Sequence, residues 1–249
     1  MKKDYKPVQF GRSKKKVASR SLAAVSSKRL RIRWGRTASH THLSHLDNIR
    51  TIEDAIRRSD IPVMYSRGKH PRMKLSFSPP LPVGFTSETE FFDINLKQDY
   101  SSQMINTLRK SMPEGFKVLE AKAVFARTAS LSEVINLVVY TLKLDNSIDT
   151  VQLQSRIYDI LSKDELIVNR KSKSGESDVN IRKSIYKIEF SEGLLTLTLG
   201  IGSEGYVRPT EVGRLLFDMD ENEVSKLKFH RAKMFRQVDE NSRIPAIEL

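Results

Sequence analysis

Three histidines lie just ahead of an amphipathic segment and are the residues best suited to proton transfer. His40 and His42 precede His45, which stands inside Ser44-x-x-Asp47. A serine followed three residues later by an acid is typical of a helix start. Because the helix dipole disfavours an imidazolium there, a neutral His45 could accept a proton or bond to a phosphate or a ribose hydroxyl. The alternative is that Ser44 and Asp47 only begin a helix.

A row of arginines follows on the helix that this start predicts. Arg50 and Arg57 are seven residues apart and therefore share a helix face, with Arg58 next to them. Asp54 stands four residues after Arg50 and is expected to pair with it. Arg57 and Arg58 have no equally obvious partner, although Glu53 precedes Arg57 by four residues. This helix is therefore expected to present cations to an anionic ligand.

The loop beyond that helix is basic and contains glycine and proline. Arg67, Lys69 and Arg72 lie within six residues, and Gly68 can adopt a positive φ that lets the backbone approach a ligand. Such loops hold phosphates by point charge and by bidentate arginine contact. If about six cations meet phosphates, affinity should fall with a log–log salt slope of about −5. The predicted RNA-binding residues are His45, Arg50, Arg57, Arg58, Tyr65, Arg67, Lys69, His70, Arg72 and Lys74.

Aromatic residues near these cations matter because sequence-specific RNA recognition stacks unpaired bases on aromatic rings. The candidates are Tyr65, Phe77, Phe85, Phe91 and Phe92. Phe77 and Phe91 fall on alternating positions of predicted strands, which indicates a place in the core. Tyr65, at the rim of the basic loop, is therefore the preferred stacking residue.

The net charge of +13 is concentrated at the beginning of the chain. Residues 1–29 carry ten lysines and arginines against one acid, residues 30–78 carry ten against four, and residues 79–249 carry 23 against 25. This is the electrostatic footprint of a nucleic-acid contact, with a solvated face as the alternative. Residues 1–28 are expected to be a basic, disordered tail, although a transit peptide would share this composition.

Several kinds of chemistry are excluded or unsupported. The chain has no cysteine, which excludes thiol nucleophiles and cysteine-ligated clusters and fits a reducing cytoplasm. No HExxH, P-loop or nucleophile-elbow pattern is present, so neither a metal nor a cofactor is expected. No run approaches the roughly 18 apolar residues of a membrane helix, and no membrane contact is expected. A metal-independent ribonuclease needs little beyond a positioned histidine and a cation, which makes His45 with Arg50 a candidate pair.

Hydrophobic periodicity and chain breakers predict an α+β fold of two tandem ferredoxin-like halves, each in the order β-α-β-β-α-β. Pro79, Pro80 and Pro82 are expected to force a rigid extended turn in the first half. That half is predicted from a strand at 29–34, a helix through 43–56, extended pieces at 63–66 and 74–78, a strand at 91–96, a helix at 102–112 and a strand at 117–125.

The second half repeats this order with one additional strand. The polar, serine-rich connection 127–133 is the expected boundary, with domains at 29–127 and 133–238. Residues 171–177 are expected to be an exposed or disordered hairpin loop. The predicted elements are a strand at 135–144, a helix at 151–161, strands at 166–169, 181–190 and 194–199, a helix at 210–217 and a closing strand at 227–235.

Several short motifs carry a family resemblance. They are Ser44-His45-Leu46-Asp47, Arg57-Arg58, Pro62-Val63-Met64-Tyr65-Ser66-x-Gly68-x-x-Pro71-Arg72, Leu75-Ser76-Phe77, Leu81-Pro82-x-Gly84-x-x-Ser87, Asp178-Val179-x-Ile181-Arg182 and Arg208-Pro209-x-Glu211. Over roughly residues 29–236 this pattern resembles the bacterial radical-SAM-linked proteins, which share the uncharacterised domain DUF2344. The chain departs from that family at Lys69, where phenylalanine is usual, and at Met73, where proline is usual.

The resemblance implies an accessory role. In that family the domain stands alone or follows a radical SAM enzyme, and its gene neighbours often encode ribonuclease G-type enzymes and ribosomal proteins. This chain has no CxxxCxxC motif, so it is similar to the accessory part and cannot itself hold the cluster that cleaves S-adenosylmethionine. The tandem layout with an early helix histidine also resembles CRISPR-associated RAMP ribonucleases, at the level of the fold alone.

Three functions follow as hypotheses. The leading one is a non-catalytic, cytoplasmic RNA-binding accessory protein that presents ribosomal or precursor RNA to a radical SAM protein or a ribonuclease. The second is a protein-interaction scaffold for a radical SAM partner. The third is a metal-independent endoribonuclease that uses His45.

Overall fold

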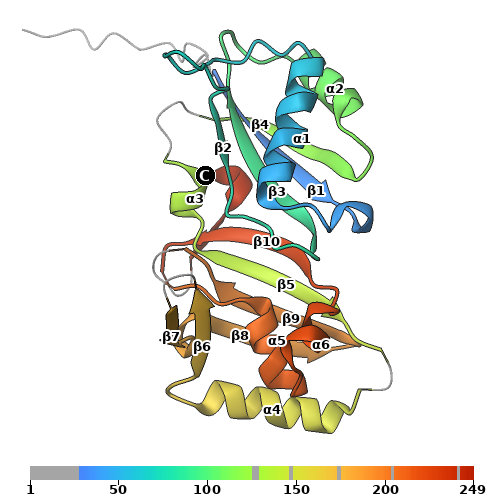
Figure 1. Ribbon diagram of the computed structural model, residues 1–249, viewed down its shortest axis with the longest axis vertical. Helices are drawn as coiled ribbons and strands as arrows, with labels where there is room; N and C mark the ends of the chain where they lie inside the picture. Colours follow the sequence, from blue (N-terminus) through green and yellow to red (C-terminus); the bar gives the residue numbers. More distant parts are fainter. Residues whose placement is uncertain (1–27, 125–128, 146–147, 173–174, 203–204, 240–241) are drawn as a thin grey trace, which may run out of the picture.

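The first half of the chain is an antiparallel sheet with two helices packed on one face. The structure is a computed structural model that describes residues 28–124, 129–145, 148–172, 175–202, 205–239 and 242–249, so the predicted tail, apart from Lys28, lies outside the described residues. The strands pair in the order β4-β1-β3-β2, the ferredoxin-like arrangement (Figure 1). The elements are β1 (Arg29–Arg36), α1 (His45–Arg58), β2 (Leu75–Phe77), β3 (Thr86–Asn95), α2 (Ser102–Ser111) and β4 (Phe116–Val124).

Apolar side chains alternate with charged ones along β1, and the apolar ones face the hydrophobic core of this half. Leu30 and Ile32 are fully buried, and Trp34 is nearly so. They join Ile52 and Ile56 of α1 in one hydrophobic cluster, as the helical spacing of those isoleucines predicts. The side chains that alternate with them are charged and lie on the opposite face of the sheet.

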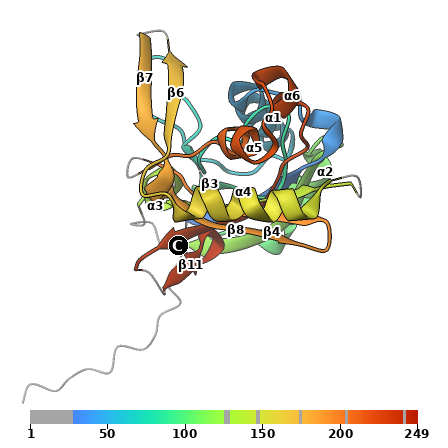
Figure 2. The same ribbon diagram turned by 90° about the horizontal axis from the view of Figure 1, so that it is seen from below.

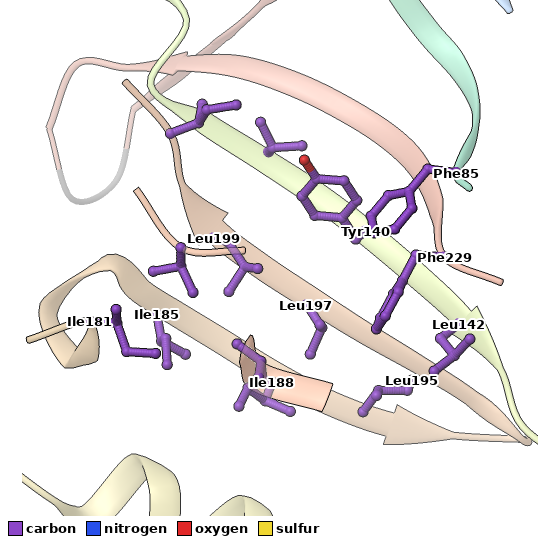
Figure 3. Close-up of a cluster of buried hydrophobic side chains, with 14 of the residues drawn as sticks. Phe85, Tyr140, Leu142, Ile181, Ile185, Ile188, Leu195, Leu197, Leu199 and Phe229 are labelled. Atoms are coloured by element: carbon purple, nitrogen blue, oxygen red, sulfur yellow. The ribbon is translucent and has the colours of Figure 1, made fainter. Parts of the chain in front are cut away.

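The second half repeats the arrangement with an inserted hairpin. Its main strands pair in the order β10-β5-β9-β8, which is again ferredoxin-like. Its core gathers Tyr140, Leu197 and Phe229 with many other apolar side chains (Figure 3). The elements are α3 (Leu131–Val134), β5 (Leu137–Lys143), α4 (Thr150–Ser162), β6 (Ile167–Ser172), β7 (Gly175–Asn180), β8 (Ile185–Ser191), β9 (Leu194–Gly200), α5 (Pro209–Phe217), α6 (Glu221–Ser225), β10 (His230–Gln237) and β11 (Arg243–Pro245).

One sheet runs through both halves. The short strand β2 pairs only with residues 92–94 of β3, which leaves the beginning of β3 free to pair in parallel with β10. His230 lies opposite Thr86, and Arg231 lies opposite Ser87. The main helices of both halves lie on the same side of this sheet (Figures 1 and 2). The division into domains at 29–127 and 133–238 stays a prediction.

A buried arginine holds the junction between the halves. Arg231 is fully buried and donates from Nη1 to Glu90 Oε1 at 3.1 Å and from Nη2 to the Tyr140 hydroxyl at 3.0 Å. It also donates to the carbonyl oxygens of Pro79 and Pro80, at 2.9 and 2.8 Å. Burial lowers the pKa of Arg231, but Glu90 and Tyr140 outweigh it and the net shift is upward. Arg231 thus holds the predicted proline turn in place through the carbonyl groups of Pro79 and Pro80.

A second buried arginine holds the other end of that turn. Arg36 donates to the carbonyl oxygens of Pro82, at 2.6 Å, of Phe85, at 2.8 Å, and of Leu43, at 3.1 Å. Burial lowers the pKa of Arg36 to about 10, against the opposing effect of Glu90. These carbonyl groups would otherwise be costly to bury.

The end of the chain lies against the first half, which the sequence did not predict. Strand β11 pairs with the end of β10, and a short 3-10 turn, Ala246–Glu248, follows it. Arg31 donates to the carbonyl oxygens of Ala246 and Leu249, both at 2.9 Å, while its Nε donates to Asp93 at 2.8 Å. The charged face of β1 is therefore partly covered by residues of the second half.

The largest differences from the predicted elements concern three segments. Strand β3 begins at Thr86 instead of residue 91, because its polar start is buried at the junction, with Ser87 and Glu90 almost inaccessible. The strand predicted at 181–190 begins at Ile185, since residues 182–184 form a 3-10 turn. Residues 171–177 belong to the β6–β7 hairpin, and residues 173–174 lie outside the described part.

Candidate nucleic-acid interface

Ser44 and Asp47 begin helix α1 by capping each other. Ser44 Oγ donates to Asp47 Oδ2 at 2.6 Å, and the Ser44 N–H donates to the same oxygen at 3.1 Å. The Asp47 N–H donates to Ser44 Oγ at 3.3 Å. The bonds from Ser44, the side-chain bond first, lower the pKa of the Asp47 carboxyl. The helix start therefore accounts for both polar side chains.

His45 lines a narrow crevice between α1 and the sheet. Trp34, Asn48 and Glu90 line it too, and its volume is about 10 Å³, the room of one water molecule. The imidazole meets Phe77 edge-on, with ring centroids 6.2 Å apart. Burial lowers the pKa of His45, Glu90 opposes this and Arg231 adds to it. A neutral imidazole is thus favoured, but the crevice has no room for a nucleotide.

The basic loop is closed by backbone hydrogen bonds at its neck. The Ser66 N–H donates to the Arg72 carbonyl at 2.8 Å, and the Arg72 N–H donates to Ser66 Oγ at 2.9 Å. Tyr65 and Met73 form an antiparallel bridge behind them. Gly68 has φ +129°, and a Cβ there would meet no atom within 4 Å, so this glycine serves the turn. The loop is therefore a defined turn that presents its side chains outward.

The cations of this loop point into solvent. Arg67, Lys69 and Arg72 are exposed, as are His70 and Lys74. Within the described residues, the three strong cations of the turn make no ion pair with any carboxylate. Unpaired guanidinium and ammonium groups are the ones free to bind phosphates.

A groove lies between α1 and the loop and is called the loop groove below. It is lined by Glu53, Arg57, Tyr65, Pro71, Arg72 and Met73 and holds about 200 Å³. Met73 is buried and forms the floor, while Tyr65 is 43 % exposed at the rim. Pockets for drug-sized ligands measure about 300–1,000 Å³, so this smaller space suits one flat ring system. The groove brings together four residues that the sequence or its motifs singled out, namely Arg57, Tyr65, Pro71 and Arg72.

Tyr65 is the one exposed ring among the five aromatic candidates. Phe85, Phe91 and Phe92 are at most 4 % exposed and belong to the core, and Phe77 is half-buried beside His45. Tyr65 alone presents an accessible face next to the cations of the loop.

Lys97 is a residue of this surface that sequence reasoning missed. Its ammonium lies 5.9 Å from the centroid of the Tyr65 ring. An antiparallel bridge between Val63 and Leu96 brings the two segments side by side. Both segments were expected to be extended, but no pattern within either segment of the sequence indicates that they pair with each other. The ring therefore has an additional cation beside it.

The arginines of α1 are more occupied than the sequence suggests. The expected Asp54–Arg50 pair is wrong, because Asp54 pairs with Arg57, which Glu53 also contacts at 3.3 Å. Arg50 is highly exposed, and its closest carboxylate is that of Asp47 at 3.9 Å. Arg57 thus has two carboxylate partners of its own.

Arg58 and His45 were also predicted to bind RNA, but neither lines the loop groove. Arg58 donates to the Ser111 carbonyl at the end of α2, at 2.8 Å. His45 stands twelve residues before Arg57, which is about 18 Å along the helix. The structure therefore gathers Arg72 of the loop with Tyr65 and Arg57, and it does not bring His45 to them.

The motif residues of the second half serve the hairpin and its surroundings. Asp178 accepts from Asn169 Nδ2 across the hairpin at 3.0 Å. Arg182 donates to the carbonyl oxygens of Leu161, at 2.6 Å, and of Lys163, at 3.0 Å, and so closes the end of α4. Arg208 lies exposed at the start of α5. These positions form a second group, separate from the basic loop.

Metal ligation and membrane insertion find no support in the part of the chain that the structure describes. No three histidine, cysteine, aspartate or glutamate side chains there are placed to hold a metal ion. No described helix is long and apolar enough to cross a membrane.

Comparison with known proteins identifies a family. The family model DUF2344, described as an uncharacterized protein conserved in bacteria, matches residues 29–209. No curated protein matches the chain. A crystal structure of the first two RRM domains of yeast poly(U) binding protein (Pub1) is 9 % identical, covers 82 % of this chain and 98 % of its own, and has a TM-score of 0.20, too low to carry an argument. Because the family match spans more than half of the 249 residues, the chain belongs to the DUF2344 family.

Proposed function

We propose that the chain is a non-catalytic RNA-binding accessory protein. The observation that carries the proposal is the loop groove, where Arg72 and the exposed Tyr65 meet beside the unpaired cations Arg67 and Lys69. Phosphates would lie on the cations, and an unpaired base would stack on the tyrosine. The ligand class is therefore RNA with unpaired bases, for which we propose ribosomal or precursor RNA.

Binding has more support than cleavage. His45 is the candidate acid or base, yet it opens on a crevice of about 10 Å³ that has no room for a nucleotide. It also lies about 18 Å along α1 from Arg57 of the loop groove. We therefore place chemistry on a partner, a radical SAM enzyme or a ribonuclease of the cytoplasm, to which this protein would present the RNA.

Fluorescence anisotropy with a labelled single-stranded RNA of mixed sequence tests the proposal. The variant carries Arg67→Ala, Lys69→Ala and Arg72→Ala in the full chain. Its affinity should fall by at least about tenfold, since charge-assisted phosphate contacts are lost. The log–log salt slope should become shallower by about 2, because each phosphate contact on a single strand contributes about 0.7.

A matched control removes the same charge elsewhere. Lys183→Ala, Lys226→Ala and Lys228→Ala change three exposed lysines of the second half. This control should bind RNA within about twofold of the unchanged chain. The same pair of variants is measured in a chain that begins at residue 28, because the cations of residues 1–27 would themselves attract RNA. Equal affinity of the loop variant and the control in both backgrounds would contradict the proposal.

A further inference from the structure

The hairpin β6–β7 stands apart from the main sheet. In the described part of the chain, β6 and β7 pair only with each other, as a separate two-stranded sheet. Figures 1 and 2 show the hairpin projecting beside the body, with β6 as the strand nearer to α5. One edge of β6 is therefore occupied by β7, and its other edge faces α5.

Two adjoining hollows of about 340 and 410 Å³ lie between β6 and the α5–α6 region. Both are lined by Asn169, Glu211 and Arg214, so they lie next to each other and are together called the hairpin groove below. The residues 167–169 line one hollow and 169–171 the other. Successive side chains of a strand point to opposite faces, so a groove on one face would be lined by every second residue. Here consecutive residues of β6 line the groove, which indicates that it runs along the edge of the strand.

That edge carries backbone groups without a strand partner. In a two-stranded antiparallel ribbon, about half of the N–H and C=O groups of each strand point away from its partner. Such an edge is a template for another extended segment, and proteins normally cover or blunt it. Here the groove keeps it accessible while α5 forms the opposite wall. An added strand would thus gain main-chain hydrogen bonds on one side and side-chain contacts on the other.

The side chains of the groove favour a peptide over a nucleic acid. Most of its cations are already paired within the chain, as the contacts Arg170–Glu211 at 2.7 Å, Arg214–Glu221 at 3.5 Å and Lys171–Glu176 at 3.2 Å show. Phosphates would have to compete with these carboxylates. The groove therefore lacks the unpaired cation cluster that the basic loop has.

The two ends of the groove differ in character. At one end Ile167 is 54 % exposed and Leu215 37 %, with Met219 lining the same hollow. At the other end Arg208 is exposed, and no described carboxylate forms an ion pair with its side chain. An apolar side chain fits the first end, and a carboxylate fits the second.

We propose that the hairpin groove binds an extended segment of a partner protein, which adds as a strand to the free edge of β6. The segment places an apolar side chain against Ile167 and Leu215 and an acidic side chain against Arg208. The motif at the start of α5 contributes Arg208 and Glu211 to this groove and is not used by the proposed RNA surface. The site is independent of the loop groove.

Phage display on the immobilised full chain supplies the probe, a library of random linear peptides. Selected peptides are synthesised with a fluorescent label and measured by anisotropy. We expect them to carry both an apolar and an acidic residue, and Arg208→Glu to weaken binding by at least about tenfold. Leu215→Ser should weaken it too. Val151→Ser, on the exposed face of α4, should leave it unchanged.

Backbone methylation of the peptide separates strand addition from other binding modes. Methylating alternate nitrogens in one register should abolish binding, and in the other register it should have little effect, because only every second N–H faces β6. Hydrogen exchange should show protection of β6 amides by the peptide. Failure to select any peptide, equal binding to Arg208→Glu, or tolerance of both methylation registers would overturn the proposal. Protection of β6 by RNA or by self-association of the chain would also overturn it.

Discussion

The two halves of the molecule carry an insertion at the same place in the same fold. In each, the chain between the first helix and the second strand is extended, by residues 59–74 in the first half and by residues 163–184 in the second. The first insertion lies against α1 and forms the loop groove, and the second lies against α5 and forms the hairpin groove. Equivalent positions of a repeated fold thus build two different surfaces.

The insertions differ in how their cations are paired more than in how many they have. Residues 59–74 contain four lysines and arginines, and residues 163–184 contain six. Arg67 and Lys69 of the first make no ion pair with the described carboxylates, whereas Arg170 of the second holds Glu211 with two hydrogen bonds, at 2.7 and 2.8 Å. Arg182 binds backbone carbonyls. A count of cations alone would therefore favour the second insertion over the loop that we propose as the RNA surface.

The largest expected effect comes from breaking the junction that joins the halves. Arg231→Met leaves the buried Glu90 carboxylate without its partner, which costs about 3–5 kcal/mol of unfolding free energy. The measurement is urea unfolding followed by the fluorescence of Trp34, the single tryptophan of the chain, which is buried and stacked on Phe116.

Two further variants serve as controls for the effect of Arg231→Met on stability. Lys233→Met lies two residues along β10 with an exposed side chain and should change stability by less than about 0.5 kcal/mol. Replacing both partners, as Arg231→Met with Glu90→Leu, should recover part of the loss, because no charge is then left unpaired. A single transition of unchanged midpoint in Arg231→Met would mean that the junction does not hold the halves together.

The contrast between paired and unpaired cations gives the second prediction. Arg170→Met removes the partly buried contacts to Glu211 and to the Tyr206 carbonyl and should cost about 1.5–3 kcal/mol of stability. Its RNA affinity should stay unchanged. Arg67→Met should do the opposite, with unchanged stability and weaker RNA binding. Urea unfolding and anisotropy on the same two proteins test this, and parallel behaviour of the two variants would contradict the contrast.

The order of elements could be predicted because its signals are local. The alternation in β1 and the spacing of isoleucines in α1 depend only on neighbouring residues. The pairing of β3 with β10 could not be predicted. The start of β3 is polar, and its Glu90 is buried against Arg231, which is more than 140 residues away in the sequence.

The candidate site shows the same limit. The cations of the loop could be recognised from composition, and Tyr65 from its place at the rim. Whether a cation is free depends on partners distant in sequence, as Arg58 with the Ser111 carbonyl shows. Lys97 reaches Tyr65 only through a bridge between two separate extended segments. Pairing of this kind leaves no local trace in the sequence.

Matched variants of two exposed tyrosines, Tyr65 in the first half and Tyr158 in the second, test whether RNA affinity depends on the ring beside the basic loop. Tyr65→Ala should weaken RNA binding by about 1–3 kcal/mol if one base stacks on the ring, and Tyr65→Phe should preserve the affinity. Tyr158 of α4 is 72 % exposed in the second half, so Tyr158→Ala should have no effect. Anisotropy with the same labelled RNA measures all three. Loss of affinity in both alanine variants would mean that exposed rings bind RNA without regard to the loop.

The smallest effect concerns the helix starts, which also differ between the halves. The first turn of α1 contains His45, whereas α4 is capped by Asp149, which accepts from the N–H groups of Val151 and Gln152. Burial, opposed by Glu90, lowers the pKa of His45, so the folded state resists its protonation. The unfolded chain takes up that proton near the ordinary pKa of histidine, about 6.5.

The sign of the pH effect follows from this difference. The contribution of His45 to stability is full above about pH 6.5 and is lost as the pH falls toward the lowered pKa of the folded state. His45→Gln should therefore flatten the fall in urea midpoint between neutral and mildly acidic pH, and His70→Gln, on the exposed loop, should not. An identical pH slope in all three proteins would show that the crevice under α1 does not exclude the proton. His45 would then be as open to solvent as the histidine of the loop, and burial under α1 would no longer distinguish the two imidazoles.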